Sequence, residues 1–345
     1  MIASIVAIAL FATSEEPVEV TNLILSTGTP ESSLTPQGVM LVMSDPDGSL
    51  GARLSHIRVE TIVVPAFAKK TAYLGQASER EFYFQEFAPG SSKVWKWGPG
   101  SEPKVVYSIE AEEPDLLRVL EDGSLSEVGK DESSFYTRGG KLQSSTRLER
   151  GQWKYEATVG GKDPSFFVIQ RSTDVGARAQ IVSEGKIRDF LGSTDWGGSV
   201  ATSYRSGYTA LNLLPKSFLK EPSVEPTWGP FTVESHAPWQ PALANAKGQV
   251  KMLEVRKSSA YGGVFASKAL AVNAQGIVVG STVSKNGEYL ASEAVVWQNG
   301  KCKFVSELFP RFGTRLKECV AISDTGQVLA VTEGSRPRVF LFCLP

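Results

Sequence analysis

The feature that most constrains the fold is a segment near the end of the chain that occurs twice, fifty residues apart. Residues 270–276 (Leu-Ala-Val-Asn-Ala-Gln-Gly) recur as residues 320–326 (Val-Ala-Ile-Ser-Asp-Thr-Gly). In each copy a short apolar strand runs into a polar turn closed by glycine, and a second strand follows. Repetition at this period is typical of proteins built from repeated sheet units. The repeat therefore predicts an architecture and carries no chemistry of its own.

Most of the remaining chain has the same pattern of short apolar segments and turns. Short runs of β-branched and aromatic residues alternate with Gly, Asp-Gly and Asn-Gly, and no long segment has the 3.6-residue period of a helix. This pattern favours an all-β sandwich, barrel or propeller.

Two kinds of turn recur. In the first, an amide or acidic side chain precedes glycine and can hydrogen-bond the following backbone. In the second, an apolar or aromatic strand end stands three residues before glycine, as at Trp297, where Asn299-Gly300 is a hairpin signal that sets Trp297 opposite Cys302. We interpret the following as structural turn residues: Asn273, Gly276, Trp297, Asn299, Gly300, Asp324 and Gly326.

Two hairpins make a four-stranded unit, which is the blade of a β-propeller. Dividing the roughly 310 residues after the first 36 by about 40 to 50 per blade gives six or seven blades. We therefore predict an all-β fold, a degenerate β-propeller with about four antiparallel strands per blade. It forms a single domain over residues 37–345.

The N-terminus has the composition of an export signal. Residues 1–12 are almost wholly apolar, and small residues flank a cleavage point before Glu15, so we interpret residues 1–14 as a signal peptide. The alternative is a buried N-terminal strand. Residues 15–36 are rich in Glu, Ser, Thr and Pro and are interpreted as a tether. The expected location is periplasmic, cell-surface or secreted, with no membrane attachment after cleavage.

The C-terminal quarter resembles the HAF repeat of bacterial extracellular proteins, over about residues 269–345. That repeat combines an Ile-Asn-x-x-Gly turn, a Val-Val-Gly strand, a His-Ala-Phe-Leu-Trp strand and an Asn-Gly hairpin. The corresponding segments are 272–276, 278–280, 293–297 and 299–300, with Glu293 in place of the His and Val295 in place of the Phe. The resemblance implies an exported propeller-like protein, and it transfers no catalytic residues because the family has no generally assigned reaction.

Charge and residue counts exclude several classes of function. The net charge of −1 offers no basic stripe for nucleic acid. With only two histidines and no Gly-x-Ser-x-Gly elbow, the sequence gives no support to nucleophile–base catalysis. The three cysteines match no zinc spacing, and either one disulfide with a free thiol or three buried thiols fits them. We predict no catalytic residues, metal or cofactor.

Two segments, 172–176 and 193–197, share a Ser-Thr-Asp-x-Gly core. This core is similar to the Asp-box turn of sialidase-type propellers, although the closing aromatic residue is missing. In that family the Asp satisfies backbone N–H groups of a hairpin, which implies a structural role for Asp174 and Asp195.

One loop has the composition of a binding surface. Residues 221–241 are rich in proline and carry Trp228, His236 and Trp239. Aromatic residues on rigid loops commonly bind ligands, because they offer a large face at low entropic cost. These three are the candidate ligand-binding residues. The alternative is that the tryptophans fix a crossing between blades to the core.

The sequence therefore predicts an exported, non-catalytic and monomeric β-propeller whose loops bind a glycan, an envelope component or a protein partner. The main alternative is a glycan-active hydrolase or lyase with carboxylates on the propeller axis, since glycosidic cleavage needs two carboxyl groups with separated pKa values. A third alternative is a passive surface module without a small ligand.

Overall fold

The computed structural model describes most of the chain, and all structural statements below concern these residues. They are 16–22, 33–43, 54, 57–88, 90–109, 117–129, 132–148, 154–173, 176–190, 196–217, 238–256, 263–286 and 289–345.

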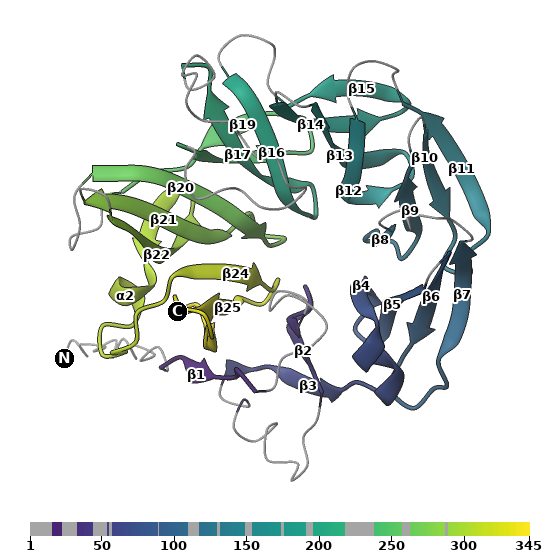
Figure 1. Ribbon diagram of the computed structural model, residues 1–345, viewed down its shortest axis with the longest axis horizontal. Coiled ribbons are helices and arrows are strands. Elements are labelled where there is room, and N and C mark those ends of the chain that lie inside the picture. Colours follow the sequence, from purple (N-terminus) through teal and green to yellow (C-terminus); the bar gives the residue numbers. More distant parts are fainter. Residues whose placement is uncertain are drawn as a thin grey trace, which may run out of the picture.

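Six four-stranded antiparallel sheets stand around a central axis as the blades of a β-propeller (Figure 1), which confirms the predicted fold class. The blades are numbered in chain order, and the strands of blades I to V are given from the innermost strand to the outermost. Blade I is β4 (Ala72–Ser78), β5 (Glu81–Ala88), β6 (Ser91–Trp97) and β7 (Lys104–Ile109); blade II is β8 (Leu117–Val119), β9 (Leu125–Val128), β10 (Glu132–Tyr136) and β11 (Leu142–Arg147). Blade III is β12 (Lys154–Asp163), β13 (Phe166–Thr173), β14 (Gly176–Ser183) and β15 (Lys186–Asp189); blade IV is β16 (Trp196–Arg205), β17 (Tyr208–Pro215), β18 (Gln240–Asn245) and β19 (Val250–Met252). Blade V is β20 (Gly263–Val272), β21 (Val278–Asn286), β22 (Tyr289–Gln298) and β23 (Lys301–Phe304).

The N-terminal segment completes the last blade. Blade VI is β24 (Glu318–Ile322), β25 (Gln327–Val331) and β26 (Val339–Cys343), with β1 (Val18–Glu19) as its outer strand. Strand β1 pairs antiparallel with β26, and the adjacent Val20 is buried. Part of the segment interpreted as a tether therefore belongs to the ring, because the unpaired edge of β26 offers backbone partners that a polar segment can use.

A pair of parallel strands separates blades VI and I. Strand β2 (Val39–Val42) pairs with β3 (Glu60–Val63), and all four residues of β2 are buried. Met40 and Val42 pack with blade VI, whereas Val39 and Leu41 pack with blade I and the 3₁₀ helix η3 (Ala66–Lys70). Burial on both faces explains why β2 reads as a continuous apolar run, as is typical of strands in parallel sheets.

Buried amide side chains connect neighbouring blades. Asn212 on β17 is fully buried and forms two hydrogen bonds of 2.8 Å with the backbone of Ala269 on β20, donating to its carbonyl and accepting from its N–H. Gln170 on β13 makes the equivalent contacts with Ser199 and Ala201 on β16. Both contacted strands carry a register irregularity near these residues. The side chains thus satisfy backbone groups that a bulged strand cannot pair within its own sheet.

The fifty-residue repeat corresponds to blades V and VI. Its two turns lie side by side: the Asn273 side chain donates to the carbonyl of Ser323 at 3.2 Å, and Asp324 accepts from the N–H of Ala274 at 2.9 Å. Equivalent turns of successive repeats meet because each inner strand stands next to the following one around the axis. Within the described residues, no helix is long and apolar enough to cross a membrane.

Candidate functional site

The candidate binding loop is only partly described. Trp228 and His236 lie outside the described residues. Trp239 is 3% exposed and packs with Ala177, Val200 and Leu214 between blades III and IV. Its indole ring thus occupies the core position that the alternative interpretation gave it, and it offers no open face for a ligand.

The predicted turn residues lie at hairpins. The carbonyl oxygen of the Asn273 side chain accepts from the N–H groups of Gln275 and Ile277, and Gly276 has a φ of 73°. Asn299 and Gly300 both have positive φ, at 55° and 84°, as a two-residue hairpin of this twist requires.

That hairpin sets the register of blade V. Trp297 pairs with Cys302, which confirms the predicted register, and the Trp297 indole donates to the carbonyl of Glu254 at 2.7 Å. Gly326 has a φ of 89° and lies in the corresponding turn of blade VI. Asp174 and Asp195 lie outside the described residues.

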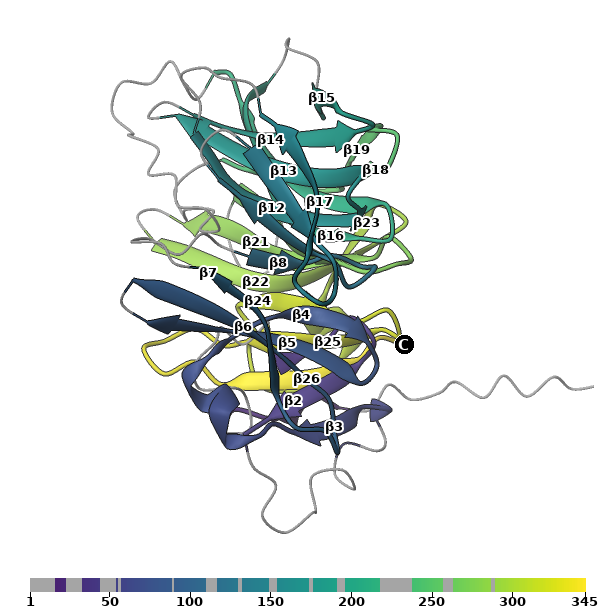
Figure 2. The same cartoon turned by 90° about the vertical axis from the view of Figure 1, so that its right-hand side faces the viewer.

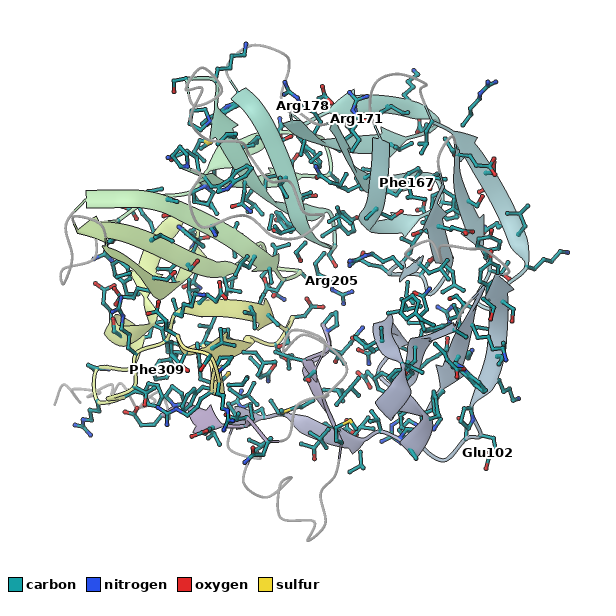
Figure 3. The ribbon with its side chains drawn as sticks, viewed as in Figure 1. Glu102, Phe167, Arg171, Arg178, Arg205 and Phe309 are labelled. Atoms are coloured by element: carbon teal, nitrogen blue, oxygen red, sulfur yellow. The ribbon has the colours of Figure 1, made fainter. Side chains whose placement is uncertain are left out.

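Asp324 has a role that turn chemistry does not explain. Arg205, the last residue of β16, donates to Asp324 through Nε at 2.9 Å and through Nη2 at 2.6 Å. Its Nη1 lies 3.4 Å from a carboxylate oxygen of Glu121. These residues come from blades II, IV and VI, and Figure 3 places Arg205 near the middle of the ring. We call Arg205, Glu121 and Asp324 the axial cluster.

The axial cluster is largely shielded from water. The side chains of Arg205, Glu121 and Asp324 are 17%, 19% and 21% exposed. Burial raises the pKa of Glu121, against the opposing effects of the hydrogen bond from the N–H of Ser206 and the charge of Arg205. Asp324 also accepts from the N–H of Ala274. Both carboxylates are therefore already engaged by donors of the protein itself.

This arrangement limits the chemistry that the axis can support. Hydrolysis of a glycosidic bond needs one carboxyl group that donates a proton and a second that is free to attack carbon or activate water. Here a guanidinium lies between the two carboxylates, bonded to Asp324 and close to one oxygen of Glu121. Within the described ranges, no three His, Cys, Asp or Glu side chains are grouped as metal ligands.

A second site is a cleft at the boundary of blades V and VI. Its volume is about 450 Å³, and three segments line it: Ser292 on β22, residues 313–317 before β24, and residues 332–338 between β25 and β26. Glu318 and Val331 are paired at one end of the β24–β25 ladder, and Asp324 lies in the turn at its other end. The cleft and the axial cluster therefore lie at opposite ends of the same strands, on the two faces of the disc seen edge-on in Figure 2.

Positive charge dominates this cleft, which we call the basic cleft. Its charged lining consists of Arg315, Lys317, Arg336 and Arg338 against Glu333 alone. Hydroxyl groups come from Ser292, Thr314 and Thr332. Such a lining attracts anions, because guanidinium groups present several donors in a geometry that suits carboxylate and phosphate oxygens.

All three cysteines are free thiols. Cys302 and Cys319 are buried, and Cys343 is half-buried. Burial raises the pKa of Cys302 to about 12 and also raises the pKa of Cys319. The structure therefore supports the interpretation of three thiols that pack as small apolar residues and does not contain the alternative disulfide.

Sequence reasoning did not identify the axial cluster or the basic cleft. Arg205 gives no local signal, since Asp324 lies 119 residues later on blade VI and Glu121 lies on blade II. The cleft had one available signal: four cationic residues fall within 315–338, a segment that otherwise consists of strands and turns.

Similarity to known proteins is confined to solved structures. No family model matches the chain and no curated protein sequence matches it, so the HAF-repeat resemblance stays a prediction. Among solved structures, the β-propeller domain of the Trilobed protease from Pyrococcus furiosus, described as having an open velcro topology, aligns with a TM-score of 0.49 at 11% identity, over 79% of this chain and 81% of that one. The acylaminoacyl peptidase of Pyrococcus horikoshii aligns with a TM-score of 0.47 at 10% identity, over 79% of this chain and only 43% of the peptidase. A putative TolB from Agrobacterium tumefaciens gives 0.41 at 13% identity, over 80% and 90% of the two chains.

Proposed function

We propose that this chain is an exported, non-catalytic β-propeller that binds a partner, either a glycan, an envelope component or a protein, on the face that carries the basic cleft. The observation that carries the proposal is the basic cleft itself, a concave site of about 450 Å³ with four cationic side chains. Small-molecule sites commonly have volumes of about 300 to 1,000 Å³. The partner is therefore one that presents acidic groups.

The axial cluster supports a binding role over a catalytic one. The guanidinium of Arg205 bonds Asp324 through two nitrogens and lies close to Glu121. A substrate that used these carboxylates would first have to displace Arg205, at the cost of leaving partly buried charges without partners. The cluster is better suited to holding three blades together than to reacting.

Export of the chain is part of the same proposal. The apolar residues 1–12 support it, and cleavage before Glu15 leaves the strand Val18–Glu19 whole for pairing with β26. Sequencing of the N-terminus of the protein recovered outside expressing cells tests this point, and a mature chain that starts at Glu15 is expected. A chain recovered only inside the cells and starting at Met1 would contradict it.

The binding proposal is tested with the purified protein and a panel of acidic and neutral glycans and peptides. Titration calorimetry measures binding, and chromatography measures product release. We expect at least one acidic member to bind and none to be cleaved. Absence of any binding across the panel would leave the passive surface module as the better interpretation.

A glycan-active hydrolase is the second candidate, because the pKa of Glu121 is raised, as is common for catalytic acids. Release of sugar products by the wild-type protein, abolished by Glu121→Gln, would establish this candidate and overturn the proposed function.

A further inference from the structure

The composition of the basic cleft indicates the charge of its ligand. Glu19 on β1 lies 3.5 Å from Arg338 and neutralises one of the four cations at the rim. Glu333 also lines the cleft, and its negative charge offsets a second cation in the charge count. An excess of two positive charges therefore remains, and a ligand group that carries two negative charges would balance it.

The cationic side chains stand on two walls. Arg315 and Lys317 come from the connection to β24, and Arg336 and Arg338 come from the hairpin between β25 and β26. Arg315 donates to the carbonyl of Ser292 at 3.1 Å, and the guanidinium of Arg338 lies 5.3 Å from the centre of the Phe340 ring. These contacts hold two of the four cations in place before any ligand arrives, which reduces the entropy lost on binding.

The other two cations are available to a ligand. In the part of the chain that the structure describes, neither Lys317 nor Arg336 makes an ion pair with a carboxylate. Lys317 is half-buried and Arg336 is exposed. A cation that faces a shared concave space without a carboxylate partner gains most from an incoming anion, since no existing pair has to be broken.

The volume of the cleft is larger than a bare ion would fill. A water molecule occupies roughly 30 Å³ in the liquid, so about 450 Å³ is on the order of ten water volumes or more. The hydroxyl groups of Thr314 and Thr332 and the carboxylate of Glu333 provide further hydrogen-bonding partners in this space. A hydroxylated molecule attached to the anionic group would use them.

We propose that the basic cleft binds a dianionic phosphate monoester group, carried on a small hydroxylated molecule such as a sugar. The proposal rests on the binding role proposed above and narrows it to one class of ligand. The group lies between the two walls and is held by Lys317 and Arg336 together with the anchored arginines. A phosphate monoester carries close to two negative charges at pH 7, and its oxygens suit the paired hydrogen bonds of guanidinium groups.

The test is titration calorimetry of the full chain with glucose 6-phosphate, glucose 6-sulfate, inorganic phosphate, malate and glucose, at low ionic strength. We expect the sugar phosphate to bind more tightly than inorganic phosphate and glucose not to bind. Equal affinity for inorganic phosphate would assign the free ion as ligand and remove the sugar from the proposal. Glucose 6-sulfate carries a single negative charge, and its binding as tightly as the sugar phosphate would overturn the assignment of a dianionic group. Tighter binding of malate, or no binding of any anion, would overturn the proposal.

A pair of variants separates the cleft from general surface charge. Lys317→Gln combined with Arg336→Gln removes two cations that have no ion pair among the described residues, so the fold should persist. Hydrogen bonds to charged groups contribute about 1.5–3 kcal/mol each, so we expect at least a ten-fold loss of affinity for the sugar phosphate. The matched control is Arg147→Gln combined with Lys186→Gln, which removes the same charge from exposed positions on blades II and III. An equal loss in the control would overturn the proposal.

The same variants distinguish failure of this proposal from failure of the proposed function. If a member of the glycan and peptide panel binds wild type and the Lys317→Gln, Arg336→Gln protein equally, the binding function stands and the cleft proposal fails. If the sugar phosphate binds and no member of the panel does, the cleft stands as a small-molecule site and the partner-binding function fails.

Discussion

Replacement of Arg205 by Met should destabilise the ring in a way that depends on pH. Met retains much of the apolar stem and removes the charge, so Glu121 and Asp324 are left without their shared cation. Breaking a fully buried ion pair costs about 3–5 kcal/mol, whereas an exposed pair contributes about 0.2–1 kcal/mol. The three side chains are about four-fifths buried, and the contact with Glu121 is the longer one at 3.4 Å. We therefore expect a loss of about 2–4 kcal/mol at pH 7.

The pH dependence follows from the direction of the Glu121 pKa. Burial raises this pKa and the charge of Arg205 opposes the rise, so removing Arg205 raises the pKa further. A carboxyl group whose folded pKa exceeds its unfolded value of about 4.3 favours the folded state when it is protonated. That contribution is present below the unfolded pKa and is lost as the pH rises through the folded pKa. The deficit of the variant is therefore smallest near pH 4.5 and grows toward pH 8.

Urea unfolding followed by tryptophan fluorescence, at several pH values between 4.5 and 8, measures this deficit. Arg147→Met, at an exposed position on β11, is the control and should stay within about 0.5 kcal/mol of wild type. The double variant Arg205→Met, Glu121→Gln should recover part of the loss at pH 8, because it no longer buries that unpaired carboxylate. A deficit below about 0.5 kcal/mol, or one equal at pH 4.5 and pH 8, would refute the reasoning.

Three further outcomes are expected. Between pH 4.5 and pH 8 the Glu121→Gln variant should lose less free energy of unfolding than the wild type does. The reason is that the raised pKa makes the charged carboxylate the less favoured form in the folded state. Parallel pH profiles of the two proteins would contradict this. Asn212→Leu leaves the buried N–H of Ala269 without its partner and should cost about 2–4 kcal/mol in urea unfolding, whereas Gln298→Leu at an exposed strand end should cost about 0.5 kcal/mol or less. Burial raises the pKa of all three thiols, to about 12 for Cys302, so none should react rapidly with a disulfide reagent at pH 8 in the native protein. All three should react in denaturant, and fewer than three would indicate a disulfide.

The fold could be predicted from the sequence because its signals are local. Asn299-Gly300 specifies a two-residue hairpin through positive φ at both positions, and the register of Trp297 with Cys302 follows from it. The fifty-residue repeat likewise consists of strands and turns that each occupy fewer than ten residues. Such features depend on neighbouring residues, so they are present in the sequence before the chain is folded.

The site could not be predicted, because it depends on which blades face one another. Arg205 meets Asp324 and Glu121 only when the ring is complete, and no periodicity links an arginine to carboxylates on two other blades. The position of Asp324 before glycine predicts a turn residue, and no feature of the neighbouring sequence indicates its pairing with Arg205 across the axis. The strand Val18–Glu19 could not be predicted for a related reason. Two residues are too few to show a period, and they form a strand only because they pair with the free edge of β26.

Closure of the ring by β1 has a consequence for the order in which the chain acquires its structure. The side chain of Thr21 accepts from the N–H of Val339, 318 residues further along the chain. At a synthesis rate of about 5–20 residues per second, the N-terminal strand waits on the order of tens of seconds for its partner to be made. During that interval its backbone groups and the edges of the nascent blades are open to pairing with other chains. Strands β1 and β26 are the most widely separated paired strands of the described ring, so their pairing carries the largest loop-closure entropy, and we expect ring closure to be a slow step of refolding from denaturant.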